Sequence, residues 1–325
     1  MNYIGSKQKL SPWIKSIIDG SYLGNLNEAV FADIFAGTGQ VARHFKKHVK
    51  KVIVNDLEGY SYVLNKHYIG NTIDLERPSL AFSPAEGIFY NNFSEVGVIP
   101  RKYFTIENAK SIDGIRQSIE EQFNLKQINE GQYYWLLASL VEAADKVANT
   151  ASVYGAFLKN YKKSALKEID LKLVDYDITE QVNEVHQRDA NALIKEIKGN
   201  ILYLDPPYNA RQYGANYHVL NKLVDYKDFT SEKITGLTDY NKSNYCKKDK
   251  VHSEFEQLIK DADFEYIFIS YNNEGLIQED EFQAILKKYG QYTLHKKEYK
   301  RFKADSKRPN QAPTTFEHLH QLIKK

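Results

Sequence analysis

The residues of this chain best suited to chemistry are the four of the run Asp205-Pro-Pro-Tyr208. They follow the apolar run 201–204 and precede a polar loop over 209–213, a pattern that predicts a buried parallel strand ending in a turn. Proline has no N–H and cannot continue a central strand, so the chain must leave the sheet there. Because open α/β sheets bind ligands beyond the carboxyl ends of their strands, we expect a site in which Asp205 and nearby carbonyls accept hydrogen bonds from an amino group and Tyr208 stacks on a flat ring. A strand-end turn with an ordinary Asp is the alternative.

Candidate binding residues also gather near the N-terminus. The run 29–34 is predicted to be a buried strand, and residues 35–39, Phe-Ala-Gly-Thr-Gly, follow it as a turn before a predicted helix over 40–46. A strand, a glycine turn and a helix begin a nucleotide-binding βαβ unit. Gly37 and Gly39 would let the backbone approach a ligand closely.

Two acids flank this turn. Asp33 precedes it, and Asp56 follows the next predicted strand, 51–54, at the place where an acid would meet ribose hydroxyls. The run from Asp33 to Gly39 has the pattern D-x-F-x-G-x-G. It differs from the G-x-G-x-x-G of dinucleotide-binding proteins, which argues against a pyrophosphate resting on the helix.

Taken in order, these motifs resemble the Dam-like D12 class of DNA adenine-N6 methyltransferases. The resemblance covers most of the chain, and its N-terminal motif, Asn2-Tyr-Ile-Gly-Ser-Lys7, differs from the K-W-x-G-G-K of Dam itself. This motif comes first and a long insertion precedes D-P-P-Y, as in the α group of amino-methyltransferases. Further stretches that resemble members of restriction-modification systems are residues 149–155, 209–213, 216–218 and 270–275.

The resemblance implies an α/β fold with a Rossmann-like sheet that binds S-adenosylmethionine, and a helical target-recognition insertion. It also implies a cofactor role for a set of residues. The methionine end of the cofactor would face Asp33, Phe35, Gly37 and Gly39, and it would be covered by Tyr3 and Lys7. Asp56 would accept hydrogen bonds from the ribose hydroxyls, and Asp189 would accept one from the adenine amine. For Asp189, an exposed helix cap is the alternative.

The expected reaction is methyl transfer to the N6 amine of an adenine in double-stranded DNA. The amine is a poor nucleophile because its lone pair is delocalised into the ring, so Asp205, Pro206 and Pro207 would act by hydrogen bonding and positioning. The base must be flipped out of the duplex, and Tyr208 would stack on it. Neither a covalent intermediate nor a metal is required, and no Cys/His cluster suggests zinc.

DNA contacts are expected from basic residues interleaved with aromatic ones, which combine phosphate contact with base stacking. Basic runs lie at 159–167, 247–250 and 296–308. The residues predicted to contact DNA are Arg211, Tyr213, Lys300, Arg301 and Lys303.

Two parts of the chain are predicted. Residues 1–80 and 186–325 would form the catalytic domain, including an antiparallel pair of strands near 291–302 and 315–323. Residues 81–185 would form the helical target-recognition insertion, with helices near 107–123 and over 132–147, and an ordinary helical cap on the sheet is the alternative. Tyr154 in this insertion is a candidate for altering the choice of DNA sequence.

Composition fits a cytoplasmic enzyme. The chain has 325 residues, of which 42% are apolar, with one cysteine and a net charge of +2. No apolar stretch approaches a membrane span, and a single cysteine excludes an internal disulfide framework. We expect a cognate restriction endonuclease as functional partner.

Four other functions stay open at this stage. A cytosine-N4 methyltransferase uses the same geometry, although that family more often has Ser in place of Asp205. An RNA adenine-N6 or a protein amide methyltransferase is disfavoured by the large insertion and by the extension 211–213. A catalytically silent DNA-binding protein is disfavoured by the intact Asp205, Tyr208 and glycine pair.

Overall fold

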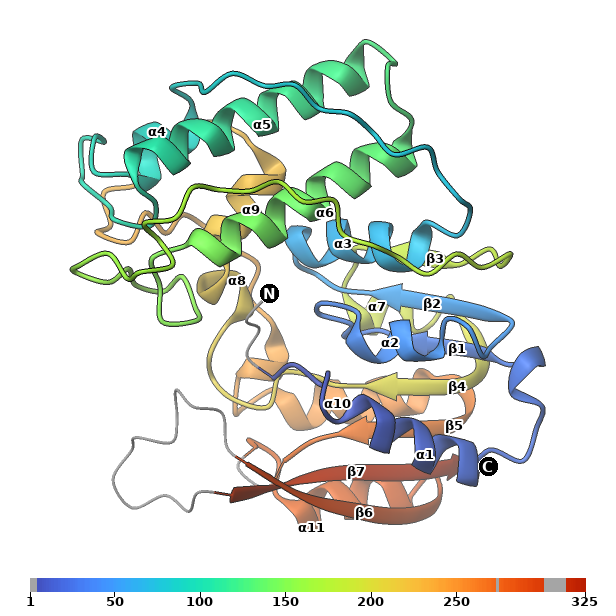
Figure 1. Ribbon diagram of the computed structural model, residues 1–325. Coiled ribbons are helices and arrows are strands. Elements are labelled where there is room, and N and C mark those ends of the chain that lie inside the picture. The colour runs from blue at the N-terminus through green and yellow to red at the C-terminus, as the bar shows by residue number, and fades with distance from the viewer. Residues whose placement is uncertain (1–4, 273–274, 301–313) are drawn as a thin grey trace. The chain divides into compact units, whose positions relative to one another are not determined.

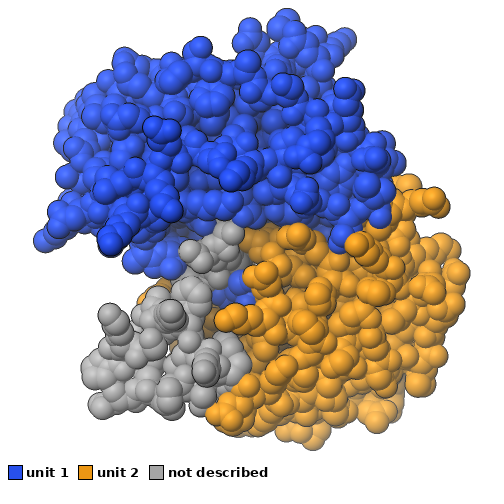
Figure 2. All heavy atoms as spheres, in the orientation of Figure 1, with its two compact units in different colours: residues 1–6, 58–178, 213–241 blue, residues 7–57, 179–212, 242–325 orange. Residues whose placement is uncertain are grey.

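The computed structural model describes residues 5–272, 275–300 and 314–325 (Figure 1). The chain divides into two compact units, shown in two colours in Figure 2. We call residues 7–57, 179–212 and 242–325 the sheet unit, and residues 1–6, 58–178 and 213–241 the helical unit.

The sheet unit contains one seven-stranded sheet (Figure 1) in the order β3-β2-β1-β4-β5-β7-β6. The first five strands in this order are parallel, and β7 runs antiparallel to both β5 and β6. The bounds are β1 (Val30–Asp33), β2 (Lys51–Asn55), β3 (Glu184–His186), β4 (Lys198–Leu204), β5 (Asp263–Ser270), β6 (Gly290–Lys300) and β7 (Thr314–Lys324). The predicted Rossmann-like α/β fold is confirmed, and so are the predicted strands beside the glycine turn, before D-P-P-Y and at the antiparallel edge.

Apolar side chains on both faces of the sheet hold the helices of this unit. On one face, Leu202 and Ile267 lie in a core cluster with Phe255 and Leu258 of α10. On the other face, Phe31 stacks on Phe45 of α2 with 4.2 Å between ring centroids. The helices are α1 (Ser11–Ser21), α2 (Gln40–Phe45), α7 (Ala190–Leu193), α10 (Val251–Asp261) and α11 (Glu279–Lys287), with 3-10 turns η1 (Leu26–Glu28) and η3 (Asn244–Cys246).

The helical unit has its own core. Its elements are α3 (Gly59–Asn65), the π-helical turn η2 (Lys66–Gly70), α4 (Ile88–Phe93), α5 (Ile106–Asn124), α6 (Glu130–Val147), α8 (Tyr213–Asn216) and α9 (His218–Asp225). The two helices predicted in the insertion are confirmed as α5 and α6. Each has an N-cap: Thr105 caps α5, and Asn129 forms a capping box with Gln132 in α6.

The boundaries of the units differ from those predicted from the sequence. The helical unit includes residues 58–80 and 213–241, which were predicted to belong to the catalytic domain, whereas residues 179–185 belong to the sheet unit. The physical reason lies in α9, which buries Val219, Leu220 and Leu223 in the core of the helical unit. Periodicity identifies the apolar face of such a helix but does not indicate which core it joins. Among the described residues, no helix is long and apolar enough to cross a membrane.

Candidate active site

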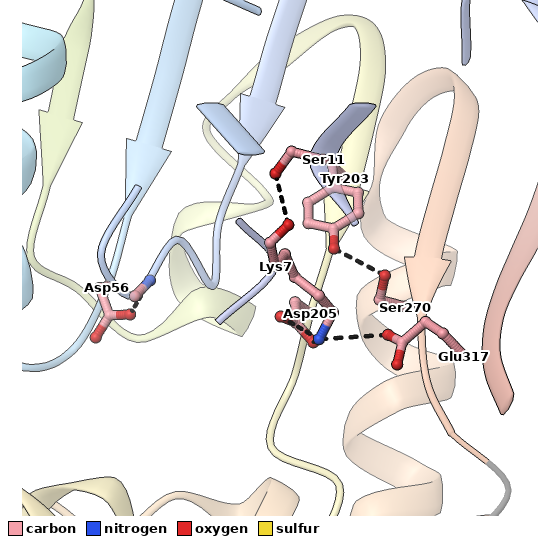
Figure 3. Close-up of polar contacts among 8 residues, drawn as sticks. Lys7, Ser11, Asp56, Tyr203, Asp205, Ser270 and Glu317 are labelled. Carbon is pink, nitrogen blue, oxygen red and sulfur yellow. Dashed lines mark hydrogen bonds and ion pairs between the residues drawn. The ribbon is translucent and has the colours of Figure 1, made fainter. Parts of the chain in front are cut away.

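Asp205 lies directly beyond β4 and belongs to a buried ion-pair cluster centred on the ammonium of Lys7 (Figure 3). The Nζ atom of Lys7 donates a 2.9 Å hydrogen bond to its Oδ1 and lies 2.9 Å from its Oδ2. The same Nζ atom lies 3.4 Å from Oε1 of Glu317 on β7. Lys7 is only 7% exposed, whereas the Asp205 side chain keeps 20% of its area accessible. One carboxylate therefore faces both a buried cation and an accessible space.

The charges of this cluster interact strongly. Burial raises the pKa of the Asp205 carboxyl, and Lys7 opposes that shift. Burial also raises the pKa of Glu317; Lys7 again opposes the shift, and Asp205 adds to it. For Lys7, burial alone would lower the pKa, but the attraction of Asp205 and Glu317 exceeds it and the pKa lies well above its ordinary value. The two carboxyl groups therefore favour the charged form of Lys7.

Asp33 is the most deeply buried acid near this cluster. It ends β1 and pairs in register with Tyr203, two residues before Asp205. It is 1% exposed, and its Oδ1 atom has no hydrogen-bond partner within the described part of the chain. Burial, Asp205 and Asp56 together raise its pKa well above the ordinary value. A buried polar atom without a partner costs free energy, so its retention points to a ligand.

The glycine turn after β1 has the backbone that its sequence predicts. Gly37 has φ +51° and Gly39 has φ +72°. Residues other than glycine rarely adopt this left-handed backbone conformation. The N–H of Gly37 donates a 2.7 Å hydrogen bond to Oδ2 of Asp56. One oxygen of Asp56 therefore fixes the turn, a role that the sequence analysis did not include.

Tyr208 is held at the end of the D-P-P-Y loop by the segment after β5. Its ring centroid lies 6.3 Å from that of Tyr271, at an interplanar angle of 77°. Its carbonyl accepts a 2.9 Å hydrogen bond from the N–H of Leu276. On β4, two residues before Asp205, the hydroxyl of Tyr203 donates a 2.8 Å hydrogen bond to Oγ of Ser270 at the end of β5. Ser270 and Tyr271, from a motif noted only for its resemblance, thus contact residues of β4 and of D-P-P-Y. Pro206 is buried, and Pro207 and Tyr208 are half-buried.

Phe35 and Asp189 lie in the same unit but differ in setting. Phe35 is half-buried and packs edge-on against Tyr245, with 5.0 Å between ring centroids. Asp189 is exposed, and its Oδ1 accepts a 2.9 Å hydrogen bond from the N–H of Ala192 at the start of α7. The structure therefore shows the helix cap that was the alternative for Asp189, while its contact with a cofactor stays a prediction.

Of the residues predicted to contact DNA, the structure describes the side chains of Arg211 and Tyr213. Arg211 is exposed in the loop after D-P-P-Y, and its N–H donates to Oδ1 of Asn209. Tyr213 starts α8 in the helical unit and stacks on Tyr217. Tyr3, Arg301, Lys303 and the side chain of Lys300 lie outside the described residues.

Tyr154 does not have the exposure that its predicted role needs. It is completely buried, and its hydroxyl donates a 3.0 Å hydrogen bond to Asp145. Its own backbone carbonyl accepts a 2.6 Å hydrogen bond from the hydroxyl of Tyr103. Tyr154 is therefore a core residue of the helical unit. The polar neighbours that suggested an exposed loop were misleading.

Glu317 is the residue of the site that the sequence analysis missed. Residues 316–322 read Phe-Glu-His-Leu-His-Gln-Leu, and strand alternation places Glu317 on the same face as Leu319 and Gln321. The signal in the sequence that could have identified Glu317 was a single acid on the same strand face as a leucine.

The single cysteine, Cys246, is buried. Burial raises the pKa of its thiol to about 11, so it is not an activated nucleophile. Within the described ranges, no group of three or more His, Cys, Asp or Glu side chains is arranged to hold a metal ion.

Comparison with known proteins identifies the family of the chain. Residues 3–285 match the family model for D12 class N6 adenine-specific DNA methyltransferases. The chain is 52% identical over 332 residues to the Type II methyltransferase M.NlaIII of Neisseria lactamica, covering all of this chain and 99% of that protein. It is 37% identical to M.CviAII of Paramecium bursaria Chlorella virus 1, covering 94% of this chain and 93% of that protein. It is also 37% identical to M.FokI of Planomicrobium okeanokoites, where all of this chain matches 53% of the longer protein.

The order of the motifs, the strand-end acid with its aromatic neighbour and the family match over most of the chain lead to one assignment. The chain belongs to the D12 class of N6 adenine-specific DNA methyltransferases.

Proposed function

We propose that this DNA adenine methyltransferase uses S-adenosylmethionine as methyl donor and acts on an adenine flipped out of double-stranded DNA, with Asp205 as acceptor for the target amine. The observation that carries the proposal is the geometry of Asp205, a strand-end carboxylate paired with a buried ammonium and still partly accessible. A carboxylate paired with a lysine ammonium is a strong hydrogen-bond acceptor in its ionised form, which Lys7 favours.

The residues of the sheet unit fit this cofactor. When bound, S-adenosylmethionine supplies a methyl group on a positively charged sulfur and also carries an amino group. Asp33 offers a buried oxygen that has no partner among the described residues, and the turn at Gly37 and Gly39 leaves room for close approach. The surplus of buried acids over the Lys7 cation suits a positively charged ligand.

For the target base, the contribution of the chain is acceptance of hydrogen bonds and positioning. Hydrogen bonds from the N6 amine to Asp205 and to the Pro206 carbonyl draw the nitrogen lone pair out of conjugation and direct it at the methyl group. Tyr208 stacks on the extruded ring. In this proposal, Asp205 also accepts the proton that the nitrogen loses after methylation.

An Asp205→Ala variant tests these roles. We expect methylation of a duplex oligonucleotide to fall by at least about 10³-fold, while calorimetric cofactor affinity changes only a few-fold, because the loss falls on the transition state. A Glu184→Gln variant, which changes an acid paired with Lys51 at the sheet edge, is the matched control and should keep full activity. Recovery of N4-methylcytosine, or methylation of RNA but not of DNA, would contradict the proposed substrate.

We also propose that residues 81–185 and the basic run 296–308 supply target recognition and phosphate contacts, with a cognate restriction endonuclease as functional partner. The names of the relatives, which are Type II methyltransferases, support the restriction-modification part of this proposal. Single-molecule sequencing of host DNA with and without the protein gives the methylated base and motif together. If exchange of the insertion with that of a relative leaves the motif unchanged, recognition lies elsewhere, in the loop after Tyr208 or in residues 227–250.

A further inference from the structure

Glu317 joins the active-site cluster from the far end of the sequence. Because β7 runs antiparallel to β5, its first residues lie at the edge where the parallel strands end. Glu317 is 4% exposed, and its Oε1 atom lies 3.4 Å from the Nζ atom of Lys7. Figure 3 shows Lys7 between Asp205 and Glu317, with interactions drawn to both.

The charges of this cluster do not cancel. Lys7 supplies one positive charge, and Asp205 and Glu317 supply two carboxylates that share it. With Glu317 ionised, the group of three carries a net negative charge; with an uncharged side chain at 317, the Lys7–Asp205 pair would be neutral. Burying an acid that leaves a surplus charge is costly, so it is retained only where something offsets the cost.

We propose that Glu317 is a positioning residue for methyl transfer: by sharing the Lys7 ammonium with Asp205, it keeps a net negative charge on the carboxylate that faces the target amine. The proposal rests on the function proposed above for Asp205. Glu317 acts through Lys7, without contact with substrate or cofactor.

The chemistry explains why such a charge matters. The nitrogen lone pair forms the new N–C bond, the C–S bond breaks and its electron pair stays on sulfur. Positive charge moves from sulfur to nitrogen, which then loses one proton. A net negative charge behind Asp205 stabilises this developing positive charge and raises the strength of Asp205 as acceptor. A neutral Lys7–Asp205 pair would stabilise the developing charge less and would make Asp205 a weaker acceptor.

Among the described residues, the other charged groups near Glu317 do not replace Lys7 in this role. Lys297 on β6 is the register partner of Glu317, and its Nζ atom lies 5.6 Å from the ring centroid of Trp13, in cation–π contact. Tyr203 on β4 faces the cluster, and its hydroxyl donates to Ser270. Asp33 on β1 adds a further buried acid.

The test compares Glu317→Gln with Glu317→Asp. We expect E317Q to slow single-turnover methyl transfer at its pH plateau on the order of tenfold, with little change in calorimetric cofactor affinity. E317D restores the charge and should recover much of the rate. The matched control is Glu279→Gln, which removes an acid paired with Lys296 and His318 of the same hairpin and should leave the rate unchanged.

Two pH measurements separate this role from a merely structural one. The first measurement is the pH profile of the rate. Removing the repulsion between Glu317 and Asp205 makes Asp205 easier to ionise, so the acid limb of the profile should move to lower pH in E317Q. Displacement of Lys7 would instead move it to higher pH.

The second measurement is the pH dependence of Tm. In the cofactor-free protein, a buried acid with a raised pKa makes stability fall as pH rises through that pKa. The fall in Tm should therefore be shallower in E317Q.

Outcomes that overturn the inference differ from those that overturn the proposed function. A plateau rate for E317Q within about twofold of the parent, or an acid limb that stays in place or moves to higher pH, rejects the role of Glu317. Full activity of Asp205→Ala in the same assay rejects the proposed function of Asp205 instead.

Discussion

Replacing Lys7 with methionine tests the charge arrangement of the site most directly. Its Nζ atom lies 2.9 Å from both oxygens of Asp205 and 3.4 Å from Glu317. Lys7→Met keeps an apolar chain of similar length but leaves two carboxyl groups without that cation. Removing one partner of a buried ion pair costs about 3–5 kcal/mol, so we expect the free energy of unfolding to fall by about that amount at pH 8.

The sign of the pH dependence follows from linkage. Burial raises the pKa of Asp205 and of Glu317, and Lys7 opposes both shifts; loss of Lys7 therefore raises both pKa values further. A carboxyl group whose pKa is higher in the folded than in the unfolded state gives stability that is greatest at low pH and is lost as pH rises through the folded pKa. The difference between K7M and the parent should therefore shrink as pH falls toward about 5.

Thermal unfolding of the cofactor-free protein between pH 5 and pH 8 provides the assay. For a chain of 325 residues, a loss of this size corresponds to a Tm lower by roughly 4–7 °C at pH 8. Lys51→Met is the matched control, because the Lys51–Glu184 pair is about one-third exposed on both side chains and such pairs contribute at most about 1 kcal/mol. A K7M protein with parental Tm at pH 8, or with a loss that does not change with pH, would refute this account.

Two further substitutions test the ligand-facing residues. Tyr208→Phe should keep methylation activity within about threefold. Tyr208→Ala should lose stacking worth ~1–3 kcal/mol, a fall of roughly fivefold to 150-fold in kcat/KM; equal losses in both variants would point to the hydroxyl. Gly37→Val places a branched side chain at φ +51°, so calorimetric cofactor affinity should fall at least about tenfold. An unchanged affinity would contradict the cofactor role of this turn.

Much of the sheet unit could be predicted from the sequence because its signals are local. The apolar run before Asp205 is bounded by two prolines, and the run before Gly37 is bounded by a glycine turn. Such boundaries restrict the backbone directly. β1, β4 and the hairpin of β6 and β7 were therefore predicted near their observed bounds.

The contacts that organise the site were not predictable in the same way, because they join distant parts of the chain. Lys7 was expected over the cofactor, but its Nζ atom contacts Asp205, 198 residues away. Asp56 was expected to hold ribose hydroxyls, and one of its oxygens holds the N–H of Gly37. Tyr154 follows α6 in a polar stretch and is nevertheless buried. In each case the side chain pairs with, or packs against, groups that only folding brings near it, and buried polar groups need such partners.

The direction and register of β7 explain how a residue near the C-terminus enters a site built from the first strands. A parallel strand in that place would present its end at the carboxyl edge; antiparallel β7 presents its beginning, where Glu317 lies. Side chains alternate between faces, so a slip of one residue would replace Glu317 with Phe316 or His318. Ser270 pairs with Leu319 in the observed register, which is fixed along β5 by buried Leu319 and Leu322. The charge beside Asp205 is therefore set by the packing of an edge hairpin and not by the D-P-P-Y motif alone.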